Sequence, residues 1–204
     1  MKLPKQILIG TKSPNKQHEI REIMGEVPFE LLTPDAVGAM PRIVEDGETF
    51  EENACKKACE LARHFNIAVL ADDSGLEVDA LGGRPGVRSH RYYDEDASDL
   101  DNNLKLLAEL EGLPEHRRTA RYRCVVALAT PKGLLMTAGG VCNGRIATEP
   151  AGSNGFGYDP LFYYPPYATT FGMIDETIKN QVSHRAEAVR KLREMLLGRQ
   201  LVRK

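Results

Sequence analysis

The sequence predicts an α/β fold built on a mixed β-sheet. In the first half of the chain, short apolar runs alternate with segments of helical periodicity, the pattern of strands that alternate with helices. In the middle, residues 122–130 and 134–142 are predicted as neighbouring strands joined by a turn at Pro131-Lys132-Gly133. A hairpin adds antiparallel pairing to a sheet that such alternation alone would make parallel, so we expect a mixed sheet flanked by helices.

We expect one domain over residues 1–204. A chain of 204 residues, 42% of them hydrophobic, can bury roughly 70% of its unfolded surface around one core. No internal repeat, low-complexity tract or flexible linker marks two independent domains in the sequence. The four cysteines are too few and too scattered for a disulfide framework, and we expect them to be reduced.

Composition and charge exclude several functional classes. Lys and Arg number 27 against 29 Asp and Glu, which leaves a net charge of -2 and no basic field for polymeric DNA or RNA. The longest uninterrupted apolar run, Cys124–Ala129, is far shorter than the ~20 residues of a membrane-spanning helix. No secretory signal is evident at residues 1–6, so we expect a cytoplasmic location without membrane contact.

Three elements are predicted in the first third of the chain. Ile7-Leu8-Ile9 is expected to be a strand that leads through a polar loop into a helix. Residues 29–33 form a second, short strand. A long helix is expected over residues 49–65, because Thr49 and Glu52 make a capping box at its start.

A buried strand is predicted at Ile67–Ala71, directly before Asp72-Asp73-Ser74-Gly75. We expect a turn at these four residues, because their polarity ends the buried run abruptly, and extended structure again over 76–78. Carboxylates at the end of a strand are candidates for a functional site.

Three further elements are predicted downstream. A helix capped by Ser98 follows a glycine-rich loop at 82–86, and residues 161–164 form a short strand. The final helix is expected to start at Ser183 and to run to about residue 197. The side chains expected to face inward are Leu100, Leu104, Leu107 and Leu110 on the first of these helices and Val189, Leu192 and Leu196 on the last.

The loop after the first strand is a candidate phosphate site. It offers Thr11, Lys12, Ser13 and Lys16 at a helix start, where unpaired N–H groups and the helix dipole favour an anion. It is not a P-loop, because the two glycines and the Gly-Lys-Ser/Thr ending of that motif are missing. The alternative is that Lys12 and Lys16 are solvated surface charges.

Acidic residues in two segments suggest a Mg²⁺ site. One segment is the predicted turn at 72–75, and the other, the acidic loop, is Glu45-Asp46-Gly47-Glu48 ahead of the long helix. Mg²⁺ prefers oxygen ligands and is usually shared between one or two protein carboxylates, water and substrate phosphates, so Asp73 plus Glu45 would suffice. The alternative is that Asp72 caps a turn and that the acidic loop is solvated.

Two segments suggest contacts to a base. Glycines surround Phe156 within residues 152–160, so the ring can stack on a nucleobase, or alternatively fill a core. Ser183-His184-Arg185 places donors in the first turn of the final helix, shortly after Lys179. Cations there oppose the helix dipole, which favours a ligand role.

Taken together and in this order, these segments resemble the inosine triphosphate pyrophosphatase family over nearly the whole chain. The matching motifs are Thr11 to Lys16, Thr49-Phe50-Glu51-Glu52-Asn53-Ala54 with Lys57, Ala71-Asp72-Asp73-Ser74-Gly75-Leu76, Gly82-Gly83-Arg84-Pro85-Gly86, Gly155-Phe156-Gly157-Tyr158-Asp159-Pro160 and Ser183-His184-Arg185. The resemblance implies an elongated mixed sheet with two lobes, an active site in the cleft between them, and a homodimer. It also implies Mg²⁺-dependent hydrolysis of deaminated purine triphosphates (ITP, dITP, XTP) to monophosphate and pyrophosphate.

The resemblance also implies roles for single residues. Asp73 falls at the catalytic carboxylate, which binds the metal and takes a proton from water, and Glu45 is expected to be the second metal ligand. Lys16 and Lys57 would act as catalytic groups that stabilise negative charge on the polyphosphate. The alternatives for the second metal ligand are Asp46 and Glu48. The residues expected to contact the substrate are Thr11, Lys12, Ser13, Pro14, Asn15, Lys16, Ser74, Phe156, Gly157, Tyr158, Asp159, Lys179, His184 and Arg185.

Base selectivity follows from hydrogen-bond chemistry. Donors at Lys179, His184 or Arg185 would pair with the 6-oxo group of hypoxanthine or xanthine, whereas the 6-amino group of adenine would leave them unpaired. The sequence leaves open how guanine, which is also a 6-oxo base, is rejected, and whether water attacks the α or the β phosphorus.

Three positions depart from the usual family pattern. Ser13 stands where asparagine is usual, His90 where a small residue is usual and Asp94 where glycine is common. Two alternatives to the main hypothesis are a same-scaffold pyrophosphatase for other modified nucleotides and a non-catalytic nucleotide-binding sensor. The complete set of charged catalytic residues favours an enzyme.

Overall fold

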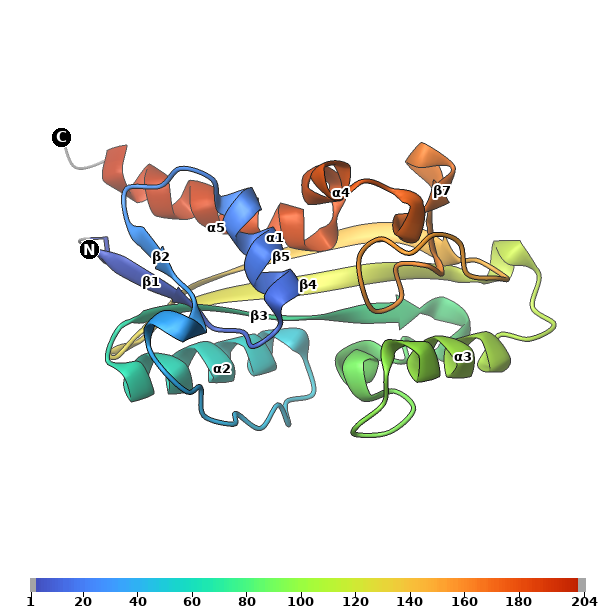
Figure 1. Ribbon diagram of the computed structural model, residues 1–204, viewed down its shortest axis with the longest axis horizontal. Helices are drawn as coiled ribbons and strands as arrows, with labels where there is room; N and C mark the ends of the chain where they lie inside the picture. Colours follow the sequence, from blue (N-terminus) through green and yellow to red (C-terminus); the bar gives the residue numbers. More distant parts are fainter. Residues whose placement is uncertain (1–2, 202–204) are drawn as a thin grey trace. The chain divides into compact units, whose positions relative to one another are not determined.

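The computed structural model of the chain describes residues 3–201 (Figure 1). Seven strands form one sheet in these residues: β1 (Gln6–Ile9), β2 (Glu30–Leu32), β3 (Ala68–Val78), β4 (Thr119–Thr130), β5 (Gly133–Ile146), β6 (Phe162–Tyr164) and β7 (Thr169–Thr170). Their order in the sheet is β2-β1-β3-β4-β5-β6-β7. β1 is parallel to both β2 and β3, and β6 is antiparallel to both β5 and β7, which confirms the predicted mixed sheet.

The α-helices are α1 (Pro14–Met24), α2 (Phe50–Phe65), α3 (Asp99–Glu109), α4 (Glu176–Val182) and α5 (His184–Leu201). Within the described residues, no helix combines the length and the apolar character that crossing a membrane requires. The chain folds into two compact units. Unit 1 contains the chain up to Asp73, Cys124–Gly140 and the chain from His184 on, and unit 2 contains Ser74–Arg123 and Val141–Ser183.

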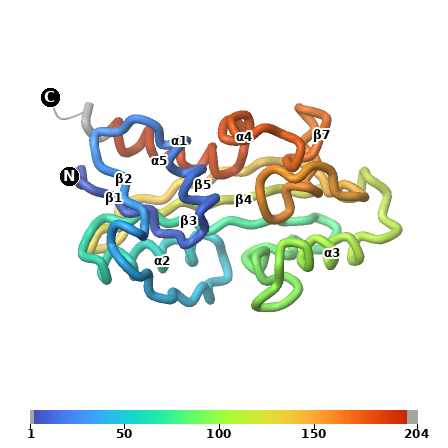
Figure 2. The backbone as a smooth tube through the Cα atoms, viewed as in Figure 1, coloured from blue at the N-terminus to red at the C-terminus, as the bar shows by residue number. Residues whose placement is uncertain are grey.

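In unit 1, alternating side chains along the strands build two apolar layers, one on each face of the sheet. Ile7, Ile9 and Leu70 pack with residues of α1 and α5, whereas Leu8 and Val69 pack with residues of α2. Accordingly, α2 lies on one side of these strands and α1 and α5 lie on the other (Figure 1). Figure 2 shows α1 and α5 against each other. The predicted inward residues of α5 are buried: Val189, Leu192 and Leu196.

Side-chain caps fix the starts of the helices next to the candidate site, and for α2 the cap is the predicted one. The Thr49 hydroxyl accepts a hydrogen bond from the Glu52 N–H (3.1 Å), and the Glu52 carboxylate accepts from the Thr49 N–H (3.2 Å), so the capping box of α2 is confirmed. At the start of α1, the Ser13 hydroxyl accepts from the Lys16 N–H (3.4 Å), and Pro14 occupies the first helical position. Both caps fix the loops that precede them.

The predicted turn at residues 72–75 is wrong, because β3 continues through them from Ala68 to Val78. Asp72 and Asp73 are both buried within this strand. Burial of a carboxylate is costly unless polar partners compensate it. Because such partners lie on both faces of the sheet, as described below, the polar pair does not have to end the strand.

The core of unit 2 is rich in aromatic side chains. The ring centroids of Tyr122 and Phe162 lie 4.5 Å apart, and those of Phe162 and Phe171 lie 5.0 Å apart. Leu76 and Val78 belong to the same cluster. Helix α4 was not predicted from the sequence, since it is short, with seven residues, and adjoins α5 almost without a connection.

The predicted packing face of α3 is wrong in its first half. Leu100 and Leu104 are 66% and 57% exposed, while Leu106 is completely buried. Asn102 explains the rotation, because its buried side chain accepts from the Tyr93 N–H (2.9 Å) and donates to the His90 carbonyl (3.2 Å). These bonds turn the polar Asn102 inward and leave the two leucines outside.

This rotation of α3 predicts that two nearby leucines contribute very unequally to the free energy of unfolding. Leu106→Ala should lower the free energy of unfolding by about 2–5 kcal/mol, because it leaves a cavity in the unit 2 core. Leu104→Ala should change it by less than about 0.5 kcal/mol, because its side chain is mostly in solvent. Urea unfolding at pH 7 measures both, and an equal loss in the two variants would contradict the helix orientation.

Candidate active site

The loop between β1 and α1 presents the N-terminus of a helix. The Thr11 hydroxyl accepts from the Ser13 N–H (3.2 Å), and the Gln17 side chain donates to the Thr11 carbonyl (3.0 Å), which closes the loop onto α1. Lys12, Pro14 and Asn15 are exposed around this turn. The loop therefore offers exposed polar groups at a positive helix end, as a phosphate site requires.

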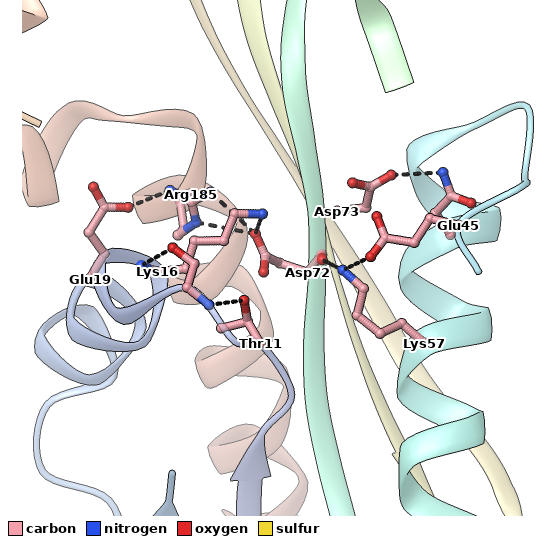
Figure 3. A network of polar contacts seen from close by, with 10 residues as sticks. Thr11, Lys16, Glu19, Glu45, Lys57, Asp72, Asp73 and Arg185 are labelled. Carbon is pink, nitrogen blue, oxygen red and sulfur yellow. Dashed lines mark hydrogen bonds and ion pairs between the residues drawn. The ribbon is translucent and has the colours of Figure 1, made fainter. Parts of the chain in front are cut away.

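Asp72 lies at the centre of a buried ion-pair network on the face of β3 that carries α1 and α5. Its Oδ2 lies 3.2 Å from the Lys16 Nζ and 3.2 Å from the Arg185 Nη2, and the Arg185 guanidinium also pairs with Glu19 (Figure 3). Burial opposes ionisation of Asp72, but the charges of Lys16, Arg185 and Lys57 outweigh it and hold the pKa of this carboxyl well below its ordinary value. Asp72 is therefore charged and structural, and it does not cap a turn.

Asp73 points to the opposite side of β3, toward α2 (Figure 3). Its Oδ2 accepts a hydrogen bond from the Asn53 side-chain amide (3.0 Å). Burial raises the pKa of the Asp73 carboxyl above its ordinary value, since the lowering effects of Lys57 and Lys16 are smaller and Glu45 adds to the rise. Neighbouring carboxylates on one strand thus have pKa values shifted in opposite directions.

Lys57 connects β3 with the acidic loop. Its Nζ donates to the Asp72 carbonyl (2.8 Å) and pairs with the Glu45 Oε1 (2.6 Å). Burial alone would lower the pKa of Lys57, but Asp72, Glu45 and Asp73 together raise it, so the lysine is charged. Lys57 therefore holds Glu45 next to the strand that carries Asp73.

The carboxylates in this region fit a Mg²⁺ ion that is shared with a substrate. Glu45 and Asp73 both lie close enough to Lys57 to raise its pKa, and Glu45 raises that of Asp73. The exposed Asp46 pairs with the half-buried Lys56 (2.5 Å), which favours Glu45 as the second ligand. In residues 3–201 no three His, Cys, Asp or Glu side chains are grouped to hold a metal alone. Mg²⁺ with one or two protein carboxylates needs no such group.

In unit 2, Phe156 stands beside a buried ion pair. The Lys179 Nζ lies 2.6 Å from the Asp159 Oδ2 and 4.6 Å from the centroid of the Phe156 ring. The same carboxylate oxygen accepts from the Phe156 N–H (2.9 Å). A Cβ on Gly155 would lie 2.0 Å from this oxygen, so only glycine permits the arrangement. The half-buried Phe156 is thus held by Asp159 and does not fill the core.

Two side chains of helix α3 form hydrogen bonds to the backbone of Gly157, the residue after Phe156. The Gly157 N–H donates to the Asp99 carboxylate (2.6 Å), and the Asn103 amide donates to the Gly157 carbonyl (2.9 Å). Tyr158 is buried, and its hydroxyl donates to the Ser89 carbonyl (2.8 Å). Asp99 and Asn103 were not among the predicted site residues, although their i, i+4 spacing places them on one face of a helix.

Family comparisons agree with this arrangement. The model of the Ham1 family matches residues 7–195. This chain belongs to the Ham1 family. A curated relative from Desulforamulus reducens, named dITP/XTP pyrophosphatase, is 45% identical over 94% of this chain and 95% of its own length. One from Shouchella clausii with the same name is 52% identical over 78% and 80%. The resemblance inferred from the motifs is thereby confirmed.

Solved Ham1 structures support the fold as well. The Staphylococcus aureus Ham1 protein superimposes with a TM-score of 0.85 and 37% identity, over 96% of this chain and 100% of its own. A HAM1 protein from Coxiella burnetii gives a TM-score of 0.85 and 37% identity, over 95% and 98%. The Ham1 fold therefore extends over nearly the whole chain.

The Ham1 motifs divide between the two units. In unit 1 the structure brings together Lys16, Lys57, Asp73 and Glu45 with Asp72, while in unit 2 it brings together Phe156, Asp159 and Lys179. Ser74 is half-buried on β3, and His184 is buried at the start of α5. Arg185 is buried against Glu19 and Asp72, and its expected contact with the purine edge stays a prediction.

Two residues of the unit 1 site were missed. Asn53 lies one helical turn before Lys57, and Glu19 lies three residues after Lys16. That spacing places each on the same helix face as its lysine, which could have pointed to them. Their partners, however, come from β3 and α5, which no local pattern relates to them.

Removing the charge of Asp72 should destabilise the protein. Asp72→Asn leaves Lys16 and Arg185 without a buried counter-charge, and we expect a loss of about 3–5 kcal/mol in the free energy of unfolding. Calorimetry at pH 7 should show the melting temperature falling by about 2–4 °C for each kcal/mol. An unchanged melting temperature would contradict the buried network.

Removing the charge of Asp73 should stabilise the metal-free protein, in contrast to the change at Asp72. Because folding raises the pKa of Asp73, the folded state binds its proton more tightly, and stability falls as pH rises from the unfolded pKa of about 3.9 through the folded value. Asp73→Asn should therefore raise the melting temperature at pH 7 without metal, and the gain should shrink below about pH 4. A lower melting temperature at pH 7 would contradict the raised pKa.

Proposed function

We propose that this chain is a pyrophosphatase that removes deaminated purine nucleotides (ITP, dITP and XTP) from the nucleotide pool. The observation that carries the proposal is the pair of carboxylates on β3. Asp72 is neutralised by Lys16 and Arg185, whereas Asp73 has a raised pKa beside Glu45 and Lys57. A buried carboxylate that a hydrogen bond from Asn53 holds in place is suited to take a proton from water. The names of the curated relatives support the substrate class.

The polyphosphate would be bound by unit 1. The N–H groups at the start of α1 attract phosphate, and Lys16 and Lys57 would stabilise negative charge that develops on the leaving group. Glu45 and Asp73 would hold Mg²⁺, which would neutralise phosphate oxygens and orient the chain of phosphates. These roles require no protein ligand beyond the two carboxylates.

In the proposed hydrolysis, Asp73 acts as the general base. A water oxygen bonds to the α or the β phosphorus, its proton passes to Asp73, and the bond from that phosphorus to the α–β bridging oxygen breaks. The bridging oxygen leaves with the other fragment, so the products are nucleoside monophosphate and pyrophosphate in either case. Lys16 and Lys57 favour this step because the departing fragment gains charge.

The base would be bound by Phe156 and the donors near it. Phe156 would stack on the purine, and Gly157, Tyr158 and Asp159 would form its surroundings. Asp159 holds the Lys179 ammonium beside the Phe156 ring, and we propose this ammonium as a donor to the 6-oxo group. His184 and Arg185 are the further donors that we propose for the purine edge. The 6-amino group of adenine presents hydrogens to the same donors and would be rejected.

Two accompanying proposals come from the family resemblance. We propose that the protein is a homodimer, which analytical ultracentrifugation measures directly, and that it acts in the cytoplasm. Pyrimidine triphosphates as substrates, or binding of nucleotides without turnover, would support the two alternative functions.

The substrate proposal predicts selective, metal-dependent release of pyrophosphate. Initial rates with dITP and XTP should exceed those with dATP by a factor on the order of ten thousand, because adenine leaves buried donors unpaired. A chelator should stop the reaction, and Mg²⁺ should restore it. Release of single phosphate, or equal rates on dITP, XTP, dATP and dGTP, would contradict the proposal.

The assignment of the base predicts a chemical defect without a binding defect. Asp73→Asn should lower kcat for dITP on the order of 10²–10⁴-fold, because water loses its proton acceptor. Binding of XTP, measured by calorimetry, should be reduced far less than kcat, since the lysines and the base-binding residues are untouched. Near-normal turnover in this variant would remove Asp73 from the mechanism.

A further inference from the structure

We infer that Asn53 is a positioning residue that sets the separation between Asp73 and Glu45 by holding β3 and the acidic loop to the same helix face. This inference rests on the proposed function of the site, in which the two carboxylates share a metal. Asn53 belongs to none of the predicted catalytic, binding or metal-ligand sets, and it acts through the residues that it contacts.

The side-chain amide of Asn53 makes a hydrogen bond at each end. Its Nδ2 donates to the Asp73 Oδ2 (3.0 Å), and its Oδ1 accepts from the Gly47 N–H (2.8 Å). The residue is 1% exposed. A reversed amide would place oxygen against oxygen at Asp73 and N–H against N–H at Gly47, so this one orientation satisfies both partners.

Helix α2 links the same two segments twice, at positions four residues apart. Asn53 contacts Asp73 and the backbone of the acidic loop, and one turn later Lys57 contacts the Asp72 carbonyl (2.8 Å) and the Glu45 carboxylate (2.6 Å). Positions i and i+4 lie on the same helix face. The helix therefore fixes the acidic loop against β3 at two points rather than one.

The acidic loop depends on a close approach to Asn53. A Cβ on Gly47 would lie 2.8 Å from the Asn53 Oδ1 and 2.8 Å from the Glu52 Cβ, so a larger residue would push the loop away. The Glu52 carboxylate accepts the next N–H, that of Glu48 (2.8 Å). Successive backbone N–H groups of the loop are thus held by side chains of α2, which leaves the position of Glu45 little freedom.

A neutral amide suits this position better than a charged donor. It orients the Asp73 carboxylate but does not cancel its charge, which the metal and the water proton both need. Replacing residues that orient metal ligands typically lowers metal affinity or activity about 10–100-fold. The effect of losing Asn53 should therefore reach both chemistry and metal binding.

The test compares wild type with Asn53→Ala and Asn53→Asp, with Lys56→Gln as the matched control. Asn53→Asp keeps the size of the side chain and the acceptor for Gly47, but it places an acceptor against Asp73. Lys56 is also on α2 and contacts the acidic loop through Asp46, but it reaches neither Asn53 nor Asp73 in its ion pair. An exposed ion pair of this kind contributes little to stability.

We expect kcat for dITP to fall about 10–100-fold in Asn53→Ala and at least as far in Asn53→Asp, with KM for dITP changed less. The Mg²⁺ concentration for half-maximal rate should rise in both. Mn²⁺ binding to the nucleotide-free protein, measured from the free-ion signal in electron paramagnetic resonance, should weaken in parallel. Lys56→Gln should stay within about twofold of wild type in all three measurements, since it leaves Asn53 in place.

Two outcomes would overturn the inference. One is an active wild type with unchanged kcat and Mg²⁺ requirement in both Asn53 variants, and the other is an equal loss in Lys56→Gln. If the wild type itself does not hydrolyse dITP, the proposed function fails. In that case the Mn²⁺ titration alone decides the inference, with weaker binding in the Asn53 variants supporting it and equal or absent binding in all proteins contradicting it.

Discussion

Two consecutive carboxylates in the middle of a buried strand set the conditions for the rest of unit 1. Successive side chains of a strand point to opposite faces of its sheet, so the carboxylates of Asp72 and Asp73 make their direct contacts with different helices. Each face must therefore supply compensation for a carboxylate removed from water. On one face Lys16 of α1 and Arg185 of α5 meet Asp72, and on the other Asn53 of α2 meets Asp73. The three helices that build the apolar layers also carry these polar groups.

The two buried carboxylates receive unequal counter-charge, so their pKa values shift in opposite directions and their expected roles differ. Asp72 pairs with two cations, which stabilise its charge and depress its pKa. Burial raises the pKa of Asp73 and the nearby Glu45 adds to the rise, while Lys57, Lys16 and the neutral amide of Asn53 offset it only in part. A group that folding leaves short of counter-charge can attract a metal ion and a proton, and such groups gather at functional sites. One strand thus carries, at adjacent positions, a structural carboxylate and the carboxylate that we propose as the general base.

Unit 2 arranges its own polar groups around an aromatic ring. Asp159 accepts from both the Phe156 N–H and the Lys179 ammonium, so one buried carboxylate fixes the ring and the cation beside it. Asp99 and Asn103 fix the next peptide from α3. The Phe156 ring and the Lys179 ammonium are therefore held in a fixed relation, as the proposed recognition of the purine 6-substituent requires.

Much of the fold could be predicted from local patterns, because caps, turns and periodicity are local. The capping box at Thr49, the hairpin and the inward face of α5 are of this kind. Where tertiary contacts determine the local structure, the prediction from the local sequence pattern was wrong. The polarity of residues 72–73 indicated a turn, because the helices that supply their polar partners are distant in sequence and a local pattern does not include them. Leu100 and Leu104 indicated a packing face, because a hydrophobic pattern does not include the hydrogen bonds that turn Asn102 inward.

The residues of the candidate site were predicted less completely than the fold. The chemistry-bearing side chains could be found through motifs. Asn53 and Glu19 share a helix face with Lys57 and Lys16, but the contacts that give them a role come from β3 and α5, which are distant in sequence. For Arg185, the structure shows two buried carboxylate partners that no motif indicated, and its contact with the purine edge stays a prediction.

The most direct test of this division between neighbouring carboxylates is a pH titration of their side-chain carboxyl carbons by NMR in the metal-free protein. We expect Asp72 to remain ionised at pH values where ordinary aspartates become protonated, and Asp73 to become protonated at a higher pH than they do. Similar titration midpoints for the two residues, or the reverse order, would contradict the claim that β3 carries one structural and one reactive carboxylate.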